Sequence, residues 1–145
     1  MNLPDVNILV YAFRPDCDQH DAARTWLSGA LDGASPLVLT SAALVGFLRV
    51  VTHPRLFPEP DDVGSALRFL DAIRGSDVAL PVEPGPRYPQ VFADLCAVTG
   101  AGGNAIPDVH IAAVAIEAGA ELVSHDRGFA RFPGLRWSDP LPVGS

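Results

Sequence analysis

Three aspartates stand at the ends of apolar segments, and these residue types suit metal chemistry. Asp5 closes the N-terminal segment, Asp108 opens the alanine-rich run 109–116, and Asp126 follows the segment 121–125. In an α/β domain the strand ends of one sheet converge, and carboxylate oxygens are the ligands that Mg²⁺ prefers. If the three side chains meet, they form a magnesium site suited to phosphoryl transfer.

A cluster of carboxylates needs a positive charge or shared protons to be stable. At about 4 Å, two carboxylates repel each other by roughly 4 kcal/mol at an effective dielectric constant of ~20. Mg²⁺ or Mn²⁺ relieves this repulsion, lowers the pKa of a bound water and neutralises charge on a phosphodiester. Acids without histidine or cysteine ligands fit this chemistry better than zinc chemistry.

Each aspartate also has a simpler local explanation. Asp5 could cap a helix that begins at Val6 or Asn7. Asp108, in the first turn of a helix, could interact favourably with the positive end of the helix dipole, an interaction worth a few tenths up to ~1 kcal/mol. Asp126 could form an Asx turn. Taken singly, the local explanation is as good as the metal site for Asp5 and better for the other two, so the hypothesis rests on the joint pattern.

Short apolar segments alternate with amphipathic ones along the chain. Glycines and prolines separate strands expected at 3–5, 37–39, 78–80, 121–124 and 135–137 from helices expected at 18–31 (with Asp18 as N-cap), 42–51, 63–74, 88–98 and 107–118. Residues 8–12 continue the first strand or begin a helix, because periodicity does not decide between them. The helix at 42–51 is apolar on nearly all sides and is expected to be buried. The alternation predicts one α/β domain over residues 1–145, a parallel sheet with helices on both faces.

The composition is that of a globular protein, with 48% hydrophobic and 19% charged residues. Net charge is −7, and all ten basic residues are arginine. A mechanism that needs lysine is therefore excluded, and a nucleic-acid groove would depend on local arginines and bound cations. Cys17 and Cys96 lack metal-site spacing. With neither a membrane-length apolar run nor a basic segment before the first apolar stretch, we expect a cytoplasmic protein with no membrane contact.

Four segments together resemble the PIN domain, specifically the VapC-type toxin ribonucleases of bacterial type II toxin–antitoxin modules. Residues 3–12 are similar to the family's opening D-x-N-x-L-x-Y-A motif, and residues 47–55 to its mid-chain helix and exit. Residues 106–113 are similar to its D-x-x-x-A-A helix start, and residues 121–129 to its S/T-x-D-x-x-F motif. The resemblance extends from residue 3 to about residue 137.

This resemblance implies a PIN-like three-layer α/β/α sandwich with a central parallel sheet. It implies the toxic component of a toxin–antitoxin module, an endoribonuclease that hydrolyses RNA with Mg²⁺ and also accepts Mn²⁺. A cognate antitoxin would inhibit it, and a homodimer is expected. On the matching positions, Asp5, Asp108 and Asp126 would be catalytic. Asp5 and Asp108 would be the principal metal ligands, and Asp126 would complete the site as a second-metal ligand or through water.

The chain departs from the family pattern at Gly46, where most members carry a glutamate before the F-L-R-V stretch. The alternative function is therefore a catalytically weakened PIN-like module that binds RNA or a protein partner. A related enzyme that cleaves DNA is also an open alternative, because the sequence does not identify a residue that recognises the 2′-hydroxyl of RNA. A phosphotransfer receiver would need a late lysine, and a haloacid-dehalogenase-type hydrolase would need D-x-D where this chain has Asp5-Val6-Asn7.

Three other polar side chains near the motifs are weaker candidates for the metal site. Asn104 and Ser124 could support the metal ligands, although an ordinary turn or strand role is favoured for each. Glu117 lies nine positions after Asp108, more than a helix turn away, and is not assigned to the site.

Histidines and arginines are weaker candidates. As general bases, His53, His110 and His125 have no partner that the sequence identifies, and a packed or hydrogen-bonded role is favoured for His110. Five arginines could contact phosphates, of which Arg127 is favoured by its place beside Asp126: Arg14, Arg49, Arg55, Arg127 and Arg131.

Overall fold

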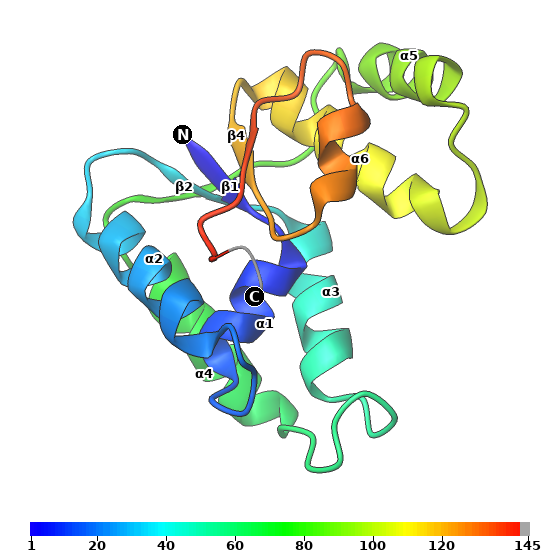
Figure 1. Ribbon diagram of the computed structural model, residues 1–145. Coiled ribbons are helices and arrows are strands. Elements are labelled where there is room, and N and C mark those ends of the chain that lie inside the picture. Colours follow the sequence, from blue (N-terminus) through cyan, green and yellow to red (C-terminus); the bar gives the residue numbers. More distant parts are fainter. Residues whose placement is uncertain (143–145) are drawn as a thin grey trace.

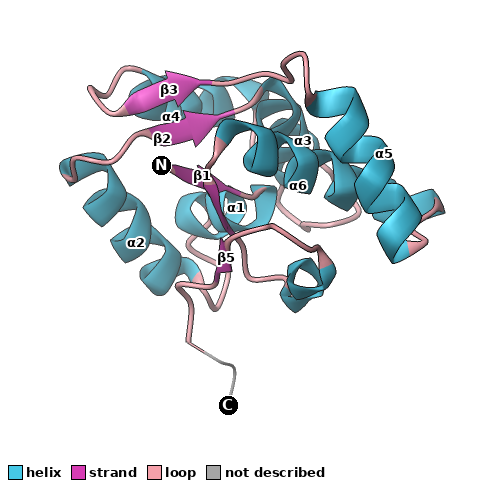
Figure 2. Cartoon of the chain, turned by 90° about the horizontal axis from the view of Figure 1, so that it is seen from above, coloured by secondary structure: helices cyan, strands magenta, loops and turns pink. Residues whose placement is uncertain are grey.

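The computed structural model describes residues 1–142 and contains a parallel sheet of five short strands in the order β3-β2-β1-β4-β5. Its elements are β1 (Asn2–Pro4), α1 (Val6–Phe13), α2 (His20–Asp32), β2 (Leu37–Leu39), α3 (Ser41–Val51), α4 (Val63–Arg74), β3 (Ala79–Pro81), α5 (Tyr88–Thr99), the 3₁₀ helix η1 (Gly103–Ala105), α6 (Ile106–Ala118), β4 (Glu121–Val123), the 3₁₀ helix η2 (Arg127–Arg131) and β5 (Trp137–Ser138). Figure 2 labels β3, β2, β1 and β5 of the sheet.

The helices lie on both faces of this sheet, as the strand pattern dictates. Successive side chains of a strand point to opposite faces. Leu37 and Leu39 of β2 pack in a core formed with α1, α2, α3 and α4, and Val38 between them packs with α5, α6 and η2. Figure 1 shows α1 to α4 on one side of the strands and α5 and α6 on the other. The predicted three-layer sandwich is therefore confirmed.

Strand β1 is the centre of the sheet and determines where the site forms. It pairs in parallel with β2 on one side and with β4 on the other, with Leu3 opposite Leu122 and Pro4 opposite Val123. Because these strands are parallel, their carboxyl ends meet at one edge of the sheet. Asp5 and Ser124, each directly after its strand, are brought together at that edge.

Several element boundaries differ from the sequence predictions. Residues 8–12 are helical, because Asp5 is extended (φ −71°, ψ 163°) and caps α1 directly after β1. Asp18 does not cap α2, which begins at His20 with no side-chain cap. Helix α3 is not buried on all sides, since Val45 is 66% exposed. The ends of α5 and α6 were predicted correctly, because Gly100 and Gly119 both adopt the left-handed conformation that glycine favours.

Arg14 links the end of α1 to the connector between α3 and α4. Its side chain is buried, and its guanidinium lies 2.6 Å from a carboxylate oxygen of Asp16 and 2.8 Å from one of Asp61. The guanidinium also stacks over the Phe57 ring at 3.8 Å. Arg14, one of the five candidate phosphate-binding arginines, is thus engaged in internal ion pairs. Within the described residues, no helix has the length and apolar character that a membrane span requires.

Candidate active site

Asp5 is held in place from both of its carboxylate oxygens. Oδ1 accepts a 2.7 Å hydrogen bond from the backbone N–H of Val6, and Oδ2 accepts a 2.8 Å bond from the hydroxyl of Ser124. Ser124 is fully buried and follows β4 directly. The capping role proposed for Asp5 and its place at a convergence of strand ends are therefore both observed.

The Ser124 hydroxyl joins two segments of the chain, residues 5–7 and residues 124–126. Besides donating to Asp5, it accepts hydrogen bonds from the side-chain amide of Asn7 (3.2 Å) and from the backbone N–H of Asp126 (3.1 Å). The Asn7 carbonyl oxygen in turn accepts from the backbone N–H of His125 at 3.4 Å. The ordinary strand role favoured for Ser124 from sequence is wrong, because this hydroxyl orients Asp5.

Asp5 and Asp108 line the same cleft, which has a volume of about 740 Å³. One side of α3, from its first turn to its last, and the N-terminal part of α6 form its walls, with Gly46, Arg49 and His110 among the lining residues. Helix α6 begins at Ile106, with Pro107 at its start and Asp108 in its first turn, as the sequence indicated. The structure therefore brings together the two predicted metal ligands from segments 103 positions apart.

Asp126 lies beside this cleft rather than on its wall. Its Oδ1 accepts a 2.8 Å hydrogen bond from the backbone N–H of Gly128, the Asx turn that the sequence suggested, and so caps η2. Its charge is close enough to raise the pKa values of Asp5 and Asp108. The catalytic role of Asp126 stays a prediction.

Burial and repulsion from neighbouring carboxylates raise the pKa values of both cleft aspartates. Burial is the main cause for Asp5, with further upward contributions from Asp108 and Asp126, and the bonds from Ser124 and Val6 oppose it. The pKa of Asp108 is raised first by burial and then by Asp126, and Arg131 opposes these two effects. A cation held by Asp5 and Asp108 would favour their charged forms and so offset the effects of burial and repulsion.

The donor set fits Mg²⁺ bound by few protein ligands. Within residues 1–142, no group of three or more histidine, cysteine, aspartate or glutamate side chains is close enough to hold a metal by itself. Mg²⁺ typically binds through one or two carboxylates, with waters and substrate phosphates supplying the rest. Asp5 and Asp108 offer oxygen ligands, and each bonded carboxylate oxygen keeps a second lone pair for a metal or its water.

Two histidines have partners that sequence reasoning missed. His110 Nδ1 lies 2.5 Å from the hydroxyl of Tyr88 on α5, so His110 is the hydrogen-bonded histidine that was favoured, but it also lines the cleft. His125 Nδ1 lies 2.8 Å from Oδ2 of Asp139 in the C-terminal segment. Neither partner falls at a helical or strand spacing from its histidine, so no sequence periodicity could have signalled these pairs.

Two glutamates near α3 and α6 have structural partners. Glu83, which no motif singled out, lines the cleft and accepts hydrogen bonds from the backbone N–H (2.6 Å) and hydroxyl (2.7 Å) of Ser41. Glu117 accepts from the backbone N–H groups of Gly85 (2.6 Å) and Arg87 (2.8 Å). Glu117 therefore anchors the loop before α5, consistent with leaving it out of the site.

Gly46 lies against α1 at the wall of the cleft. A Cβ atom at this position would lie 2.8 Å from Cγ2 of Val6, closer than real Cβ contacts allow. A glutamate could not be added here unless Val6 moved. The departure from the family pattern at Gly46 is thus accompanied by a close packing of α3 on α1.

The PIN domain family model matches residues 3–135. The chain belongs to the PIN domain family. Ribonuclease VapC43 of Mycobacterium tuberculosis is 43% identical over 137 residues, which cover 94% of this chain and 93% of that protein. The resemblance to VapC-type PIN domains stated from the motifs is therefore confirmed.

Two solved structures share this PIN fold. One is VapBC2 from Rickettsia felis bound to a DNA fragment from their promoter, with a TM-score of 0.70, 20% identity, and coverage of 95% of this chain and 97% of that one. The other is VapC20 of Mycobacterium tuberculosis, described as a sarcin-ricin loop cleaving toxin, with a TM-score of 0.67, 14% identity, and coverage of 94% and 99%.

Proposed function

We propose that this PIN domain is the toxin of a toxin–antitoxin module and a Mg²⁺-dependent endoribonuclease that also accepts Mn²⁺. The observation that carries the proposal is that Asp5 and Asp108 line one cleft at the carboxyl edge of the sheet. The VapC ribonucleases to which the chain is similar support RNA as the substrate. The absence of lysine from the sequence is compatible with this chemistry, because the attacking group is a water.

In this mechanism the protein positions acids and the phosphodiester. Asp5 and Asp108 would hold the metal, and Asp126 would complete the site directly or through water. When bound, the metal supplies an acidified water and neutralises charge on the phosphodiester. Ser124 keeps the Asp5 carboxylate oriented through its 2.8 Å bond. Arg49, which is exposed and lines the cleft, is placed to contact the RNA backbone.

The same proposal includes an antitoxin that covers the site, a homodimer and a cytoplasmic location. The R. felis neighbour is a VapBC2 structure, which supports an antitoxin partner. Apolar side chains beside Asp5 are also unusually exposed. Val45 lines the cleft and is 66% exposed, and Leu56 lines a second hollow that also includes Asp5 and is 53% exposed. Exposed apolar groups near a charged site are typical of a protein-binding surface.

The first experiment is cleavage of a mixed pool of structured RNAs by the purified chain in Mg²⁺, in Mn²⁺ and in EDTA. The Asp5→Asn variant provides the control, because it keeps the size of the side chain and one acceptor oxygen but loses the charge. Cuts that require metal and vanish in Asp5→Asn are expected. Cuts that persist in EDTA or in Asp5→Asn would overturn the proposed mechanism.

A second candidate function is a catalytically weakened module that binds RNA or a partner. The observation that favours it is Gly46, where the cleft lacks a carboxylate that most of the family has, and where Val6 leaves no room for one. A folded, antitoxin-free chain that binds RNA and Mn²⁺ but produces no cuts would support this function over the first.

A further inference from the structure

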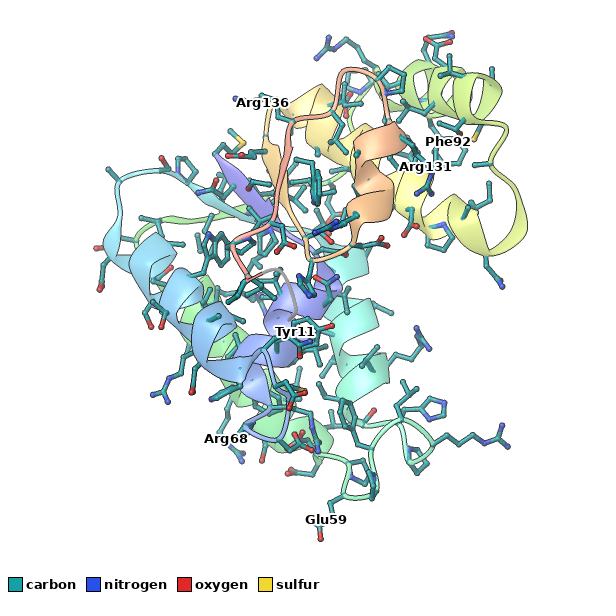
Figure 3. The ribbon with its side chains drawn as sticks, in the orientation of Figure 1. Tyr11, Glu59, Arg68, Phe92, Arg131 and Arg136 are labelled. Carbon is teal, nitrogen blue, oxygen red and sulfur yellow. The ribbon has the colours of Figure 1, made fainter. Side chains whose placement is uncertain are left out.

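Arg131 is seated at the edge of the cleft by three contacts. Its Nη2 lies 3.5 Å from Oδ2 of Asp108, and its Nη1 donates a 2.6 Å hydrogen bond to the carbonyl oxygen of Gly128. Its guanidinium carbon lies 4.4 Å from the centre of the Phe132 ring. Figure 3 labels Arg131 on η2, the segment that lies beside α6. The segment 127–132 therefore places the positive charge of Arg131 beside Asp108, a predicted metal ligand.

Gly128 leaves the space that this guanidinium fills. A Cβ atom at position 128 would lie 2.6 Å from Nη1 of Arg131 and 3.0 Å from Oδ1 of Asp126. The backbone of Gly128 is not in the left-handed region, so the requirement for glycine is one of space rather than conformation. Adding a methyl group here would displace the flexible Arg131 side chain without removing its charge.

Of the three aspartates, Arg131 forms an ion pair with Asp108. Within residues 1–142, Arg131 is the only arginine that pairs with Asp5, Asp108 or Asp126, and its partner is Asp108. The pair is partly exposed, with 38% of the Arg131 side chain and 35% of the Asp108 side chain accessible. A partly exposed ion pair of this kind is weak, so a divalent cation can replace the guanidinium at Asp108.

We propose that Arg131 competes with the divalent metal for Asp108 and, once displaced, binds a phosphodiester oxygen of the RNA substrate. This inference rests on the proposed function. A divalent cation at Oδ2 of Asp108 repels a guanidinium at the same oxygen, so the two occupy it in turn. The carbonyl of Gly128 and the ring of Phe132 keep the released guanidinium at the edge of the cleft. An arginine held there matches the geometry of a phosphodiester oxygen pair.

The competition is tested by Mn²⁺ titration calorimetry and by melting curves in EDTA and in saturating Mn²⁺. For Arg131→Ala we expect the Kd of Mn²⁺ to fall about two- to fivefold, since a partly exposed ion pair is weak. In EDTA its Tm should fall by about 1–3 °C, and in saturating Mn²⁺ this penalty should disappear. The matched control is Arg24→Ala, an exposed arginine on α2, which should change neither quantity.

A purely structural role for Arg131 gives a different result. Loss of packing on Phe132 would lower the Tm equally in EDTA and in Mn²⁺ and leave the Kd unchanged, and that outcome would overturn the competition. In an Asp108→Asn background, Arg131→Ala should no longer lower the Tm in EDTA. Gly128→Ala provides a second variant, which keeps the charge but moves it, and should also lower the Kd of Mn²⁺.

The phosphate contact is tested with binding of a phosphorothioate-linked single-stranded RNA oligonucleotide, which resists cleavage, so that Asp5 and Asp108 both stay in place to hold Mn²⁺. In Mn²⁺, Arg131→Ala should weaken this binding and reduce the slope of log K against log salt by about 0.7, one contact on a single strand. In EDTA, where Arg131 stays on Asp108, the substitution should change neither. An unchanged slope in Mn²⁺ would overturn the phosphate contact. Failure of wild-type cleavage would overturn the proposed function instead, and the Mn²⁺ competition would still be measurable.

Discussion

The hydroxyl of Ser124 donates a 2.8 Å hydrogen bond to Oδ2 of Asp5, and the two residues are 119 positions apart in the sequence. Each directly follows a strand, and those two strands, β1 and β4, are neighbours in the sheet. The bond therefore fixes the carboxylate relative to the sheet rather than to its own helix alone. The orientation of the principal acid depends on how well the sheet is formed.

Replacing Ser124 with alanine should destabilise the fold and raise the pKa of Asp5. The change removes a buried partner of Asn7 and of the Asp126 N–H, so the free energy of unfolding should fall by about 1–3 kcal/mol. The pKa of Asp5 should rise further, because the bond from Ser124 opposes the effect of burial. Urea unfolding at neutral pH measures the loss, with exposed Ser28→Ala as the control. A loss no larger than that of Ser28→Ala would contradict this role.

Asp108→Asn should abolish RNA cleavage while the fold is kept. Asparagine has the same shape but no charge, so it is a much weaker ligand of a divalent cation than the carboxylate it replaces. Metal-dependent cleavage and circular dichroism of the same preparation measure the two properties. The control is Asp94→Asn, an exposed position on α5, which should cut at the wild-type rate. Full activity in Asp108→Asn would remove Asp108 from the site.

In EDTA, Asp108→Asn should be more stable than the wild type, by a margin that grows with pH. The pKa of Asp108 is raised in the folded chain, so the folded state holds the proton more tightly than the unfolded state does. Stability of the wild type is therefore lost as pH rises from the unfolded value of about 3.9 through the raised folded value. Asparagine does not titrate and escapes this loss. Melting curves between pH 3 and 7 test the trend, and a margin that shrinks with rising pH would refute it.

Gly46→Ala should destabilise the protein even though alanine favours helices. In an unhindered helix this change would stabilise by roughly 0.5–1 kcal/mol. Here the new Cβ would lie 2.8 Å from Val6, and overpacking of this kind typically costs about 1–3 kcal/mol. Adding Val6→Ala should recover part of the loss, which thermal melting of the single and double variants would show. Stabilisation by Gly46→Ala alone would mean that the Val6 side chain moves aside at little cost in free energy.

The fold and the pairing of two acids were predictable because they depend on local patterns. Short apolar segments separated by glycine or proline gave the strands, and Gly119 gave the end of α6. Parallel strands then require Asp5 and Ser124 to meet, whichever residues surround them. Asp108 joins them because its helix precedes β4, the neighbour of β1.

The contacts that surround the acids were not predictable, because they join segments with no periodic relation. The Tyr88–His110 pair links two helices, and Glu83 reaches the start of α3 from the loop after β3. The predicted cap at Asp18 also failed: α2 begins at His20, whose ring Nδ1 lies 2.8 Å from the carbonyl oxygen of Tyr11 on α1. Motifs locate ligands, but packing between elements determines which neighbours they acquire.

The central place of β1 has a consequence for how the protein is made. The first strand synthesised lacks one of its two neighbours until β4, residues 121–123, has emerged from the ribosome. Until then Asp5 has neither Ser124 nor a formed sheet edge, so the cleft cannot take shape. We expect a chain that ends at residue 120 to show no Mn²⁺-dependent rise in Tm. The cleft, and any chemistry that depends on Asp5, would therefore appear only when synthesis of the chain is almost complete.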